Sequence, residues 1–227
     1  MFDLFGTLVP PFAKRAHRAA LAECAAVLQI APELCDAGWR GSYRARIAGE
    51  FLSVADNFDW ICRQGGQPRS ADACRQAESA HAVFTRRALS PLPGVRASLS
   101  RLRDAGARIG LLTNCAPDVP LLFAGSDLAS CFDATVFSCQ AGVVKPDRGS
   151  YEAVLQRLGA SPSAAIFVGD GSDSELTGAS AVGMTAVLVT PCLEDTYDSQ
   201  RHDVTSWSGL RFPDVCQVVD ALLQPAP

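Results

Sequence analysis

Apolar residues in the second half of the chain follow two alternating spacings. The short apolar runs with the length and flanking turns of buried strands span residues 108–114, 134–138, 164–170 and 184–190. Apolar positions recur at helical spacing, each time followed by a glycine, in residues 95–105, 150–158 and 176–182. This alternation of strand and helix predicts a Rossmann-like α/β fold with a doubly wound parallel sheet.

The first eight residues, Met-Phe-Asp-Leu-Phe-Gly-Thr-Leu, begin as an apolar run and end in the turn signal Gly6-Thr7. They predict a short strand that carries Asp3. An ionised carboxylate in an apolar strand is costly unless a partner compensates it. Asp3 therefore either caps local backbone or does chemistry at the carboxyl end of a central strand, where ligands of open α/β sheets bind.

A block of about 75 residues with only helical patterns separates this first strand from the alternating region. Its predicted helices span residues 14–30, 32–47, 54–63 and 70–88. We expect the block to be an insertion into the sheet domain. The predicted domains are an α/β core, made of residues 1–12 and 90–227, and a helical domain, residues 13–89.

The end of the chain is less regular. Residues 193–213 are polar and follow neither spacing, so we expect an irregular segment there, and residues 214–223 predict a final helix.

Composition narrows the possible functions. The chain has 227 residues, enough for one sizeable core or a core with a smaller insert. A net charge of −4 without a basic run argues against nucleic-acid binding. Membrane insertion and secretion are not expected, because the sequence has no apolar stretch of transmembrane length and no signal-peptide pattern. Nine cysteines without a CxxC pair indicate reduced thiols in a cytoplasmic protein.

Polar residues follow several predicted strands where each strand ends: Asp3, Thr113 with Asn114, Lys145 and Asp170. Because parallel strands end at the same edge of a sheet, these residues should converge on one pocket. Asp3 can attack an electrophile, and Lys145 can neutralise the charges that develop. Oxygen ligands from Asp3, Asp170 and Glu175 suit Mg²⁺.

Four motifs in chain order resemble those of the haloacid dehalogenase (HAD) superfamily of hydrolases. They are Asp3-Leu-Phe-Gly-Thr-Leu8, Leu111-Leu-Thr-Asn114, Lys145-Pro146 and Val168-Gly-Asp-Gly-Ser-Asp-Ser-Glu175. The resemblance covers residues 1–190, and the helical block resembles the C1-type cap that covers the active site in this superfamily. It implies a small anionic substrate, which is expected to contact Thr7 and Asn114.

The resemblance also implies individual roles. Asp3 corresponds to a nucleophile that forms an aspartyl intermediate, with Thr113 and Lys145 positioning the reacting groups. Asp3, Asp170, Glu175 and the backbone carbonyl of Phe5 correspond to Mg²⁺ ligands, with Asp173 as a nearby substitute for Glu175.

The chain departs from the phosphatases of this superfamily at Phe5, where they usually carry a second aspartate. That aspartate protonates the leaving oxygen, and such help is worth roughly 10²- to 10⁴-fold in rate. An aromatic residue at this position is common in the haloacid dehalogenases, whose halide leaves without a proton. Asp170 instead favours a metal-dependent phosphatase, because the haloacid dehalogenases use no metal and usually replace this acid.

The sequence therefore predicts Mg²⁺-dependent hydrolysis of a small phosphorylated metabolite. Two alternatives stay open, namely 2-haloacid dehalogenation and a repurposed, non-hydrolytic protein. Of the helical block, Arg40, Arg44 and Arg46 could bind an anion, but helical arginines usually lie on a solvated face, which is the expectation here. His17 and His81 are expected to be ordinary helical residues.

Overall fold

The computed structural model describes residues 1–190, 194–198 and 201–224. Its centre is a parallel sheet, as the spacing of apolar residues predicts. The strands are β1 (Gly110–Thr113), β2 (Ala134–Phe137), β3 (Ile166–Gly169), β4 (Thr185–Val189) and β5 (Leu210–Phe212). The ladders β1–β2, β3–β4 and β4–β5 are all parallel. The α/β fold class is thereby confirmed.

The first residues of the chain join the two halves of this sheet. Phe2 forms parallel bridges to both Leu111 of β1 and Val168 of β3. The Asp3 amide donates to the Val168 carbonyl at 2.9 Å, and the Leu112 amide donates to the Phe2 carbonyl at 3.0 Å. The order across the sheet is therefore β2, β1, residues 1–3, β3, β4 and β5, with Asp3 at the end of the central strand.

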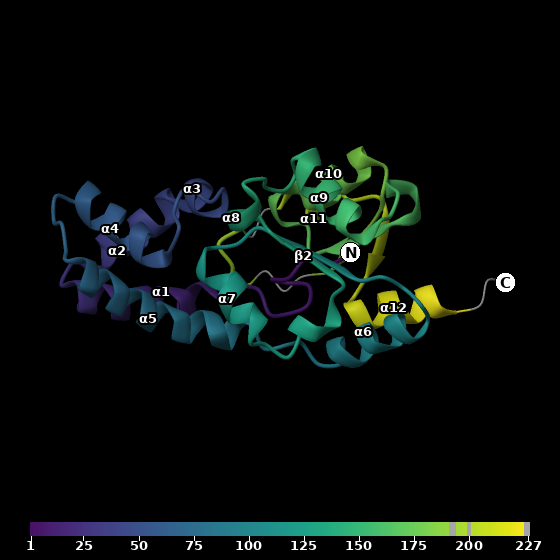
Figure 1. Cartoon of the computed structure of the whole chain (residues 1–227), viewed down its shortest axis with the longest axis horizontal. Helices are drawn as coiled ribbons and strands as arrows, with labels where there is room; N and C mark the ends of the chain where they lie inside the picture. Colours follow the sequence, from purple (N-terminus) through teal and green to yellow (C-terminus); the bar gives the residue numbers. More distant parts are fainter. Residues whose placement is uncertain (191–193, 199–200, 225–227) are drawn as a thin grey trace.

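Helices cover both faces of the sheet (Figure 1). One face packs against α6 (Val95–Asp104) and α12 (Val215–Leu223), and the other against α9 (Arg148–Leu158) and α10 (Glu175–Val182). Tyr151 of α9 is fully buried, and its hydroxyl donates to the Glu175 carbonyl at 2.7 Å. This bond ties α9 to the start of α10, where the fourth sequence motif ends.

Residues 14–88 form a separate helical layer beside the sheet (Figure 1). Its helices are α1 (Lys14–Leu28), α2 (Pro32–Gly41), α3 (Tyr43–Ile47), α4 (Val54–Gln64) and α5 (Ala71–Ala88). Two of them begin at serine N-caps, since Ser53 Oγ accepts from the Asp56 amide and Ser70 Oγ accepts from the Ala73 amide. The layer has its own apolar core, which includes Leu21, Phe58 and Ile61.

Two segments differ from the sequence prediction. The helix expected over residues 32–47 is broken at Ser42, whose hydroxyl donates to the Trp39 carbonyl at 3.2 Å. Serine side chains compete with helical backbone bonds in this way. The segment expected to be irregular contains α11 (His202–Ser206) and β5. These elements are short, and β5 is largely exposed at the sheet edge, so neither leaves an apolar pattern.

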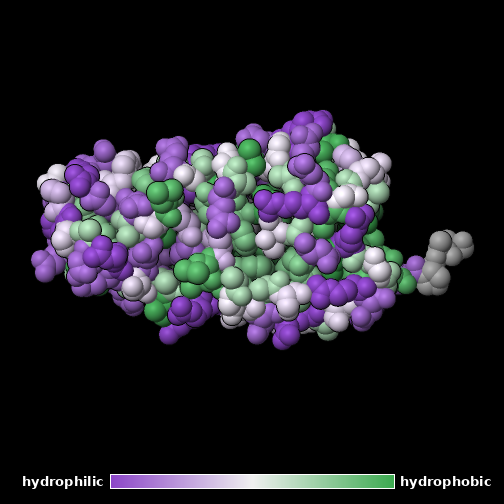
Figure 2. Space-filling model, in the orientation of Figure 1, coloured by the Kyte–Doolittle hydropathy of each residue, from purple (hydrophilic) through white to green (hydrophobic). Residues whose placement is uncertain are grey.

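Shorter helices, α7 (Asp118–Ala124) and α8 (Ser138–Ala141), connect the strands of the sheet domain. On the face shown in Figure 2, hydrophilic side chains spread over both the helical layer and the sheet domain, with smaller hydrophobic areas among them. In the described ranges, no helix combines the length and the apolar character needed to cross a membrane.

Candidate active site

Asp3 stands at the carboxyl end of the central strand and is 3% exposed. The chain turns directly after it, with Gly6 at a φ of +83° and its amide bonded to the Val9 carbonyl at 2.8 Å. A side chain at position 6 would collide with the Asp170 carboxylate, so this turn requires glycine. Thr7 Oγ1 donates to Asp3 Oδ2 at 3.4 Å. The turn therefore brings the backbone of Gly6, which follows Phe5, close to a second acid, Asp170.

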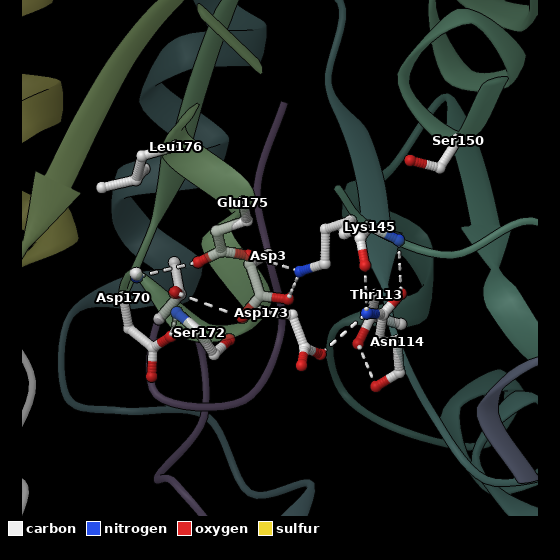
Figure 3. Close-up of polar contacts among 12 residues, drawn as sticks. Asp3, Thr113, Asn114, Lys145, Ser150, Asp170, Ser172, Asp173, Glu175 and Leu176 are labelled. Carbon is white, nitrogen blue, oxygen red and sulfur yellow. Dashed lines mark hydrogen bonds and ion pairs between the residues drawn. The ribbon is translucent and has the colours of Figure 1, made fainter. Parts of the chain in front are cut away.

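Lys145 is the cation of the site and is 1% exposed. Its Nζ lies 2.5 Å from Asp3 Oδ1 and also donates to Glu175 Oε2. Asn114 holds the lysine backbone from both sides, because its Oδ1 accepts from the Lys145 amide at 2.9 Å and its Nδ2 donates to the Lys145 carbonyl at 3.1 Å. Figure 3 shows this arrangement, with the lysine ammonium between two carboxylates.

Burial and mutual charge control the ionisation of this cluster. Burial raises the pKa of Asp3, and the Lys145 ammonium opposes that shift. The pKa of Glu175 is raised well above its ordinary value by burial and by the nearby charge of Asp3. Burial alone would lower the pKa of Lys145, but Asp3 and Glu175 outweigh it and raise that pKa. The ammonium is therefore held in its charged form by two acids.

Asp3, Asp170 and Glu175 each offer a carboxylate oxygen, and these oxygens lie within 4.8 Å of one another. All three residues are buried. Hard divalent cations such as Mg²⁺ prefer oxygen ligands of this kind. Because Gly6 has no side chain, the Asp170 carboxylate fits against it, and backbone atoms of this turn therefore also lie close to the three acids. The residues present therefore fit a divalent cation.

Asp170 has a second charged neighbour that the sequence motifs do not suggest. Arg201 forms an ion pair with Asp170 Oδ2, and its Nη1 also donates to the Asp170 carbonyl at 3.2 Å. The Ser172 amide donates to Asp170 Oδ1 at 3.1 Å. The pKa of Arg201 is raised because the charge of Asp170 outweighs the effect of burial. A cation bound at Asp170 would thus share that carboxylate with a guanidinium.

Asp173 is oriented toward the helical layer rather than into the acidic cluster. Its Oδ2 accepts from Asn114 Nδ2 and from the Tyr43 hydroxyl, both at 2.7 Å. Glu175 accepts from Lys145 and, at Oε1, from the Gly171 amide at 3.0 Å. Glu175, not Asp173, is therefore the acid that lies beside Asp3, and Asp173 connects the sheet domain to α3.

A cavity of about 460 Å³ lies over these residues. The sheet domain contributes Asp3, Phe5, Thr113, Asn114, Cys115, Asp118, Lys145 and Arg201 to its lining. The helical layer and the segment before it contribute Phe12, His17, Trp39, Tyr43, Arg46 and His81. The cavity therefore lies between the two parts of the chain, and the predicted nucleophile is on its wall.

Phe5 makes one part of this wall aromatic. Its ring centroid lies 4.5 Å from that of Phe12, which in turn lies 5.5 Å from the His17 ring and 5.2 Å from the Phe84 ring. The position that would hold a second acid is thus occupied by an apolar ring in contact with further rings.

The structure brings together most of the residues selected from the sequence. Asp3, Lys145, Asp170 and Glu175 form one buried cluster, while Thr113 and Asn114 line the cavity above it. Thr7 contacts Asp3, the predicted nucleophile, through its hydroxyl. The functional roles of these residues stay predictions.

His17 and His81 lie in α1 and α5, as expected of helical residues, and both are buried and line the cavity. One expectation about the helical block is wrong. Arg46 is buried as well, whereas its neighbour Arg44 is exposed as expected. The signal for the histidines was present in the sequence, because each occupies the buried stripe of its helix. His17 shares that stripe with Leu21 of α1.

A family model described as haloacid dehalogenase-like hydrolase matches residues 1–183. The chain belongs to the haloacid dehalogenase-like hydrolases. This hydrolase is 34% identical over 155 residues to the phosphoserine phosphatase of Thermus thermophilus. The aligned residues make up 67% of this chain and 57% of that relative. It is 28% identical to the ribulose-1,5-bisphosphate 5-phosphatase of Halopiger xanaduensis, over 86% of the chain and 85% of the relative.

Solved structures show the same fold for the hydrolase. The defluorinating L-2-haloacid dehalogenase Rha0230 superposes with a TM-score of 0.67 at 22% identity, over 98% of this chain and 94% of that one. A predicted phosphoglycolate phosphatase from Haemophilus somnus gives a TM-score of 0.63 at 16% identity, over 97% and 96%. Both dehalogenases and phosphatases are thus built on this architecture.

Proposed function

We propose that the hydrolase cleaves small phosphorylated metabolites in a Mg²⁺-dependent reaction, through an aspartyl intermediate on Asp3. The observation that carries the proposal is the contact of Asp3 with Lys145, within reach of the Asp170 and Glu175 oxygens, on the wall of a cavity. Relatives named as phosphoserine, ribulose-1,5-bisphosphate and phosphoglycolate phosphatases support the choice of phosphate esters.

In this proposal, Asp3 Oδ2 attacks phosphorus, since Oδ1 is held by the Lys145 ammonium. Lys145 keeps Asp3 oriented and compensates negative charge that builds up on the transferring group. Thr113, on the same cavity wall, binds a phosphoryl oxygen. Asn114 positions Lys145 instead, because both hydrogens of its Nδ2 are bonded to Lys145 and Asp173. Mg²⁺ held by Asp3, Asp170, Glu175 and the Phe5 carbonyl would supply further neutralisation of phosphate charge.

Phe5 limits the range of substrates. A phenyl ring cannot protonate a leaving alkoxide, so this step is left to water or to the substrate itself. We therefore expect faster hydrolysis of esters with acidic leaving groups than of simple alkyl phosphates. Residues 13–89 would act as the cap, because their side chains form the opposite wall of the cavity.

The proposal is tested with p-nitrophenyl phosphate in the presence of Mg²⁺, with and without EDTA. We expect EDTA to abolish turnover, and Asp3→Asn to reduce kcat by about 10³-fold or more. Asp127→Asn is the matched control, because Asp127 is an exposed acid of the same domain and should turn over normally. Equal rates with and without EDTA, or full activity of Asp3→Asn, would contradict the proposal.

Carbon–halogen hydrolysis is the second candidate, and the specific observation in its favour is the aromatic Phe5 on the cavity wall. Halide needs no proton on departure, so the missing acid would cost nothing. The assay is halide release from short 2-haloacids in EDTA. Release that survives chelation would support this candidate over the phosphatase, and no release from any of them removes it.

A further inference from the structure

Arg46 of α3 carries a buried positive charge in the helical layer. The residue is 4% exposed, and its guanidinium carbon lies 3.9 Å from the centroid of the Trp39 ring. Its Nη1 donates to the Trp39 carbonyl at 2.8 Å, to Ser42 Oγ at 2.9 Å and to Asn57 Oδ1 at 3.0 Å. All three acceptors are neutral, so these contacts orient the guanidinium without balancing its charge.

No carboxylate of the described residues lies within ion-pair distance of Arg46. Burial lowers the pKa of Arg46 to about 10, so it stays protonated at neutral pH. A buried charge is expensive unless a partner of opposite sign accompanies it. Asp118 is the nearby acid whose charge acts on Arg46, and it is bonded to His81 and Thr85 instead.

The same cavity wall holds further polar atoms without a partner. His17 Nε2, His81 Nε2 and Asp118 Oδ1 are buried and have no hydrogen-bond partner among the described residues. All three residues line the cavity together with Arg46. Buried polar atoms in native proteins are nearly always satisfied, so unpaired groups facing one cavity indicate a ligand or water that satisfies them.

We propose that Arg46 binds a carboxylate on the substrate, at the side of the cavity opposite Asp3. The substrate class would then be short phosphorylated carboxylic acids, with the phosphate at Asp3 and the carboxylate at Arg46. His17, His81 and Asp118 supply hydrogen bonds to polar groups beside that carboxylate. The proposal rests on the proposed phosphatase function, because it assigns the other end of the same substrate.

Arg46 also has a structural role, since its Nη1 joins α2, α3 and α4 through Trp39, Ser42 and Asn57. A purely structural arginine would affect stability and would treat all substrates alike. Selectivity between a charged and a neutral tail is therefore the measurement that separates the two roles.

The probes are phosphonopropionate and propylphosphonate, which share chain length and phosphonate and differ in the carboxylate. Their dissociation constants are measured by calorimetry with Mg²⁺ for the wild type, Arg46→Met, Arg46→Lys and Arg44→Met. We expect the wild type to prefer the carboxylate by about 10- to 100-fold, the range for a hydrogen-bonded charge pair. Arg46→Met should lose this preference, and Arg46→Lys should retain part of it.

Arg44→Met is the matched control, because Arg44 lies on the same helix, is exposed and should keep the wild-type preference. Equal affinity of the wild type for both probes overturns the subsite even where a variant fails to fold. An unchanged preference in Arg46→Met, or the same loss in Arg44→Met, also overturns it. An Arg46-dependent preference without any phosphatase activity would refute the proposed function alone, and phosphatase activity without tail preference would refute the subsite alone.

Discussion

Lys145 Nζ lies 2.5 Å from Asp3 Oδ1, although 142 positions separate the two residues in the chain. The same ammonium also contacts Glu175, and all three side chains are buried. One cation thus compensates two acids among buried side chains. Its removal would leave both carboxylates near each other without a counter-charge.

Lys145→Met should therefore destabilise the fold as well as abolish hydrolysis. We expect a loss of about 3–5 kcal/mol in the free energy of unfolding, as for one partner removed from a buried ion pair. Urea unfolding followed by circular dichroism measures it. Adding Glu175→Gln to Lys145→Met removes one of the stranded charges and should recover part of the loss, and a double variant less stable than Lys145→Met would contradict this account.

Phe5→Asp should supply the missing proton donor. We expect kcat on an ester with a poor leaving group, such as phenyl phosphate, to rise by about tenfold or more. The gain on p-nitrophenyl phosphate should be smaller, because its leaving group needs less protonation. Phe5→Leu is the control that keeps an apolar side chain and should not raise either rate. Equal gains on both esters would argue against a general-acid effect.

Arg201→Met should tighten Mg²⁺ binding. In the wild type the Arg201 guanidinium forms an ion pair with Asp170. This positive charge would repel a Mg²⁺ ion bound at the same carboxylate. We expect the dissociation constant for Mg²⁺ to fall by roughly 3- to 10-fold, from a reduced repulsion of about 1 kcal/mol. Calorimetry with MgCl₂ measures it directly, without an activity assay. Arg211→Met, a change of the same charge at an exposed site, should bind Mg²⁺ like the wild type.

Acid should destabilise the protein through His17. Burial lowers the pKa of His17 from its ordinary 6.5 to about 3. Between these values the unfolded chain binds the additional proton, so stability falls as the pH drops below 6.5. Acidification to about pH 5 should cost about 2 kcal/mol through this group. His17→Gln should show a shallower decrease, whereas His202→Gln, at a side chain 75% exposed, should keep the wild-type slope.

The convergence of Asp3, Lys145, Asp170 and Glu175 could be predicted from the sequence because it follows from the topology. Parallel strands end at one edge, so Asp3 and Asp170, each at the end of a strand, need no further information to be placed near each other. Lys145 and Glu175 lie in the segments that follow β2 and β3, and the resemblance to the superfamily motifs identified them. Strands β1 to β4 were recognisable because buried parallel strands are continuous apolar runs. Phe5 was identified as a departure from the same motif, and the structure places its ring on the cavity wall.

The partners of these residues could not be predicted in the same way. Arg201 follows a polar segment without periodicity, so nothing in the local sequence connects it with Asp170. Arg46 lies seven residues after the buried Trp39, so helical spacing places the two on the same side, but its bond to Asn57 of α4 is not contained in that spacing. The contacts of both arginines depend on how distant elements pack, which a local pattern does not contain.

The central place of residues 1–3 has a consequence for how the protein is made. This strand is synthesised before its two neighbours, β1 and β3, which begin at residues 110 and 166. During synthesis the helices of residues 14–88 are complete long before the sheet can close around Phe2. Pairings of such long sequence separation form slowly and expose unpaired edges meanwhile. Asp3 is thus synthesised long before the strands that surround it, and it reaches its final surroundings only when both have formed.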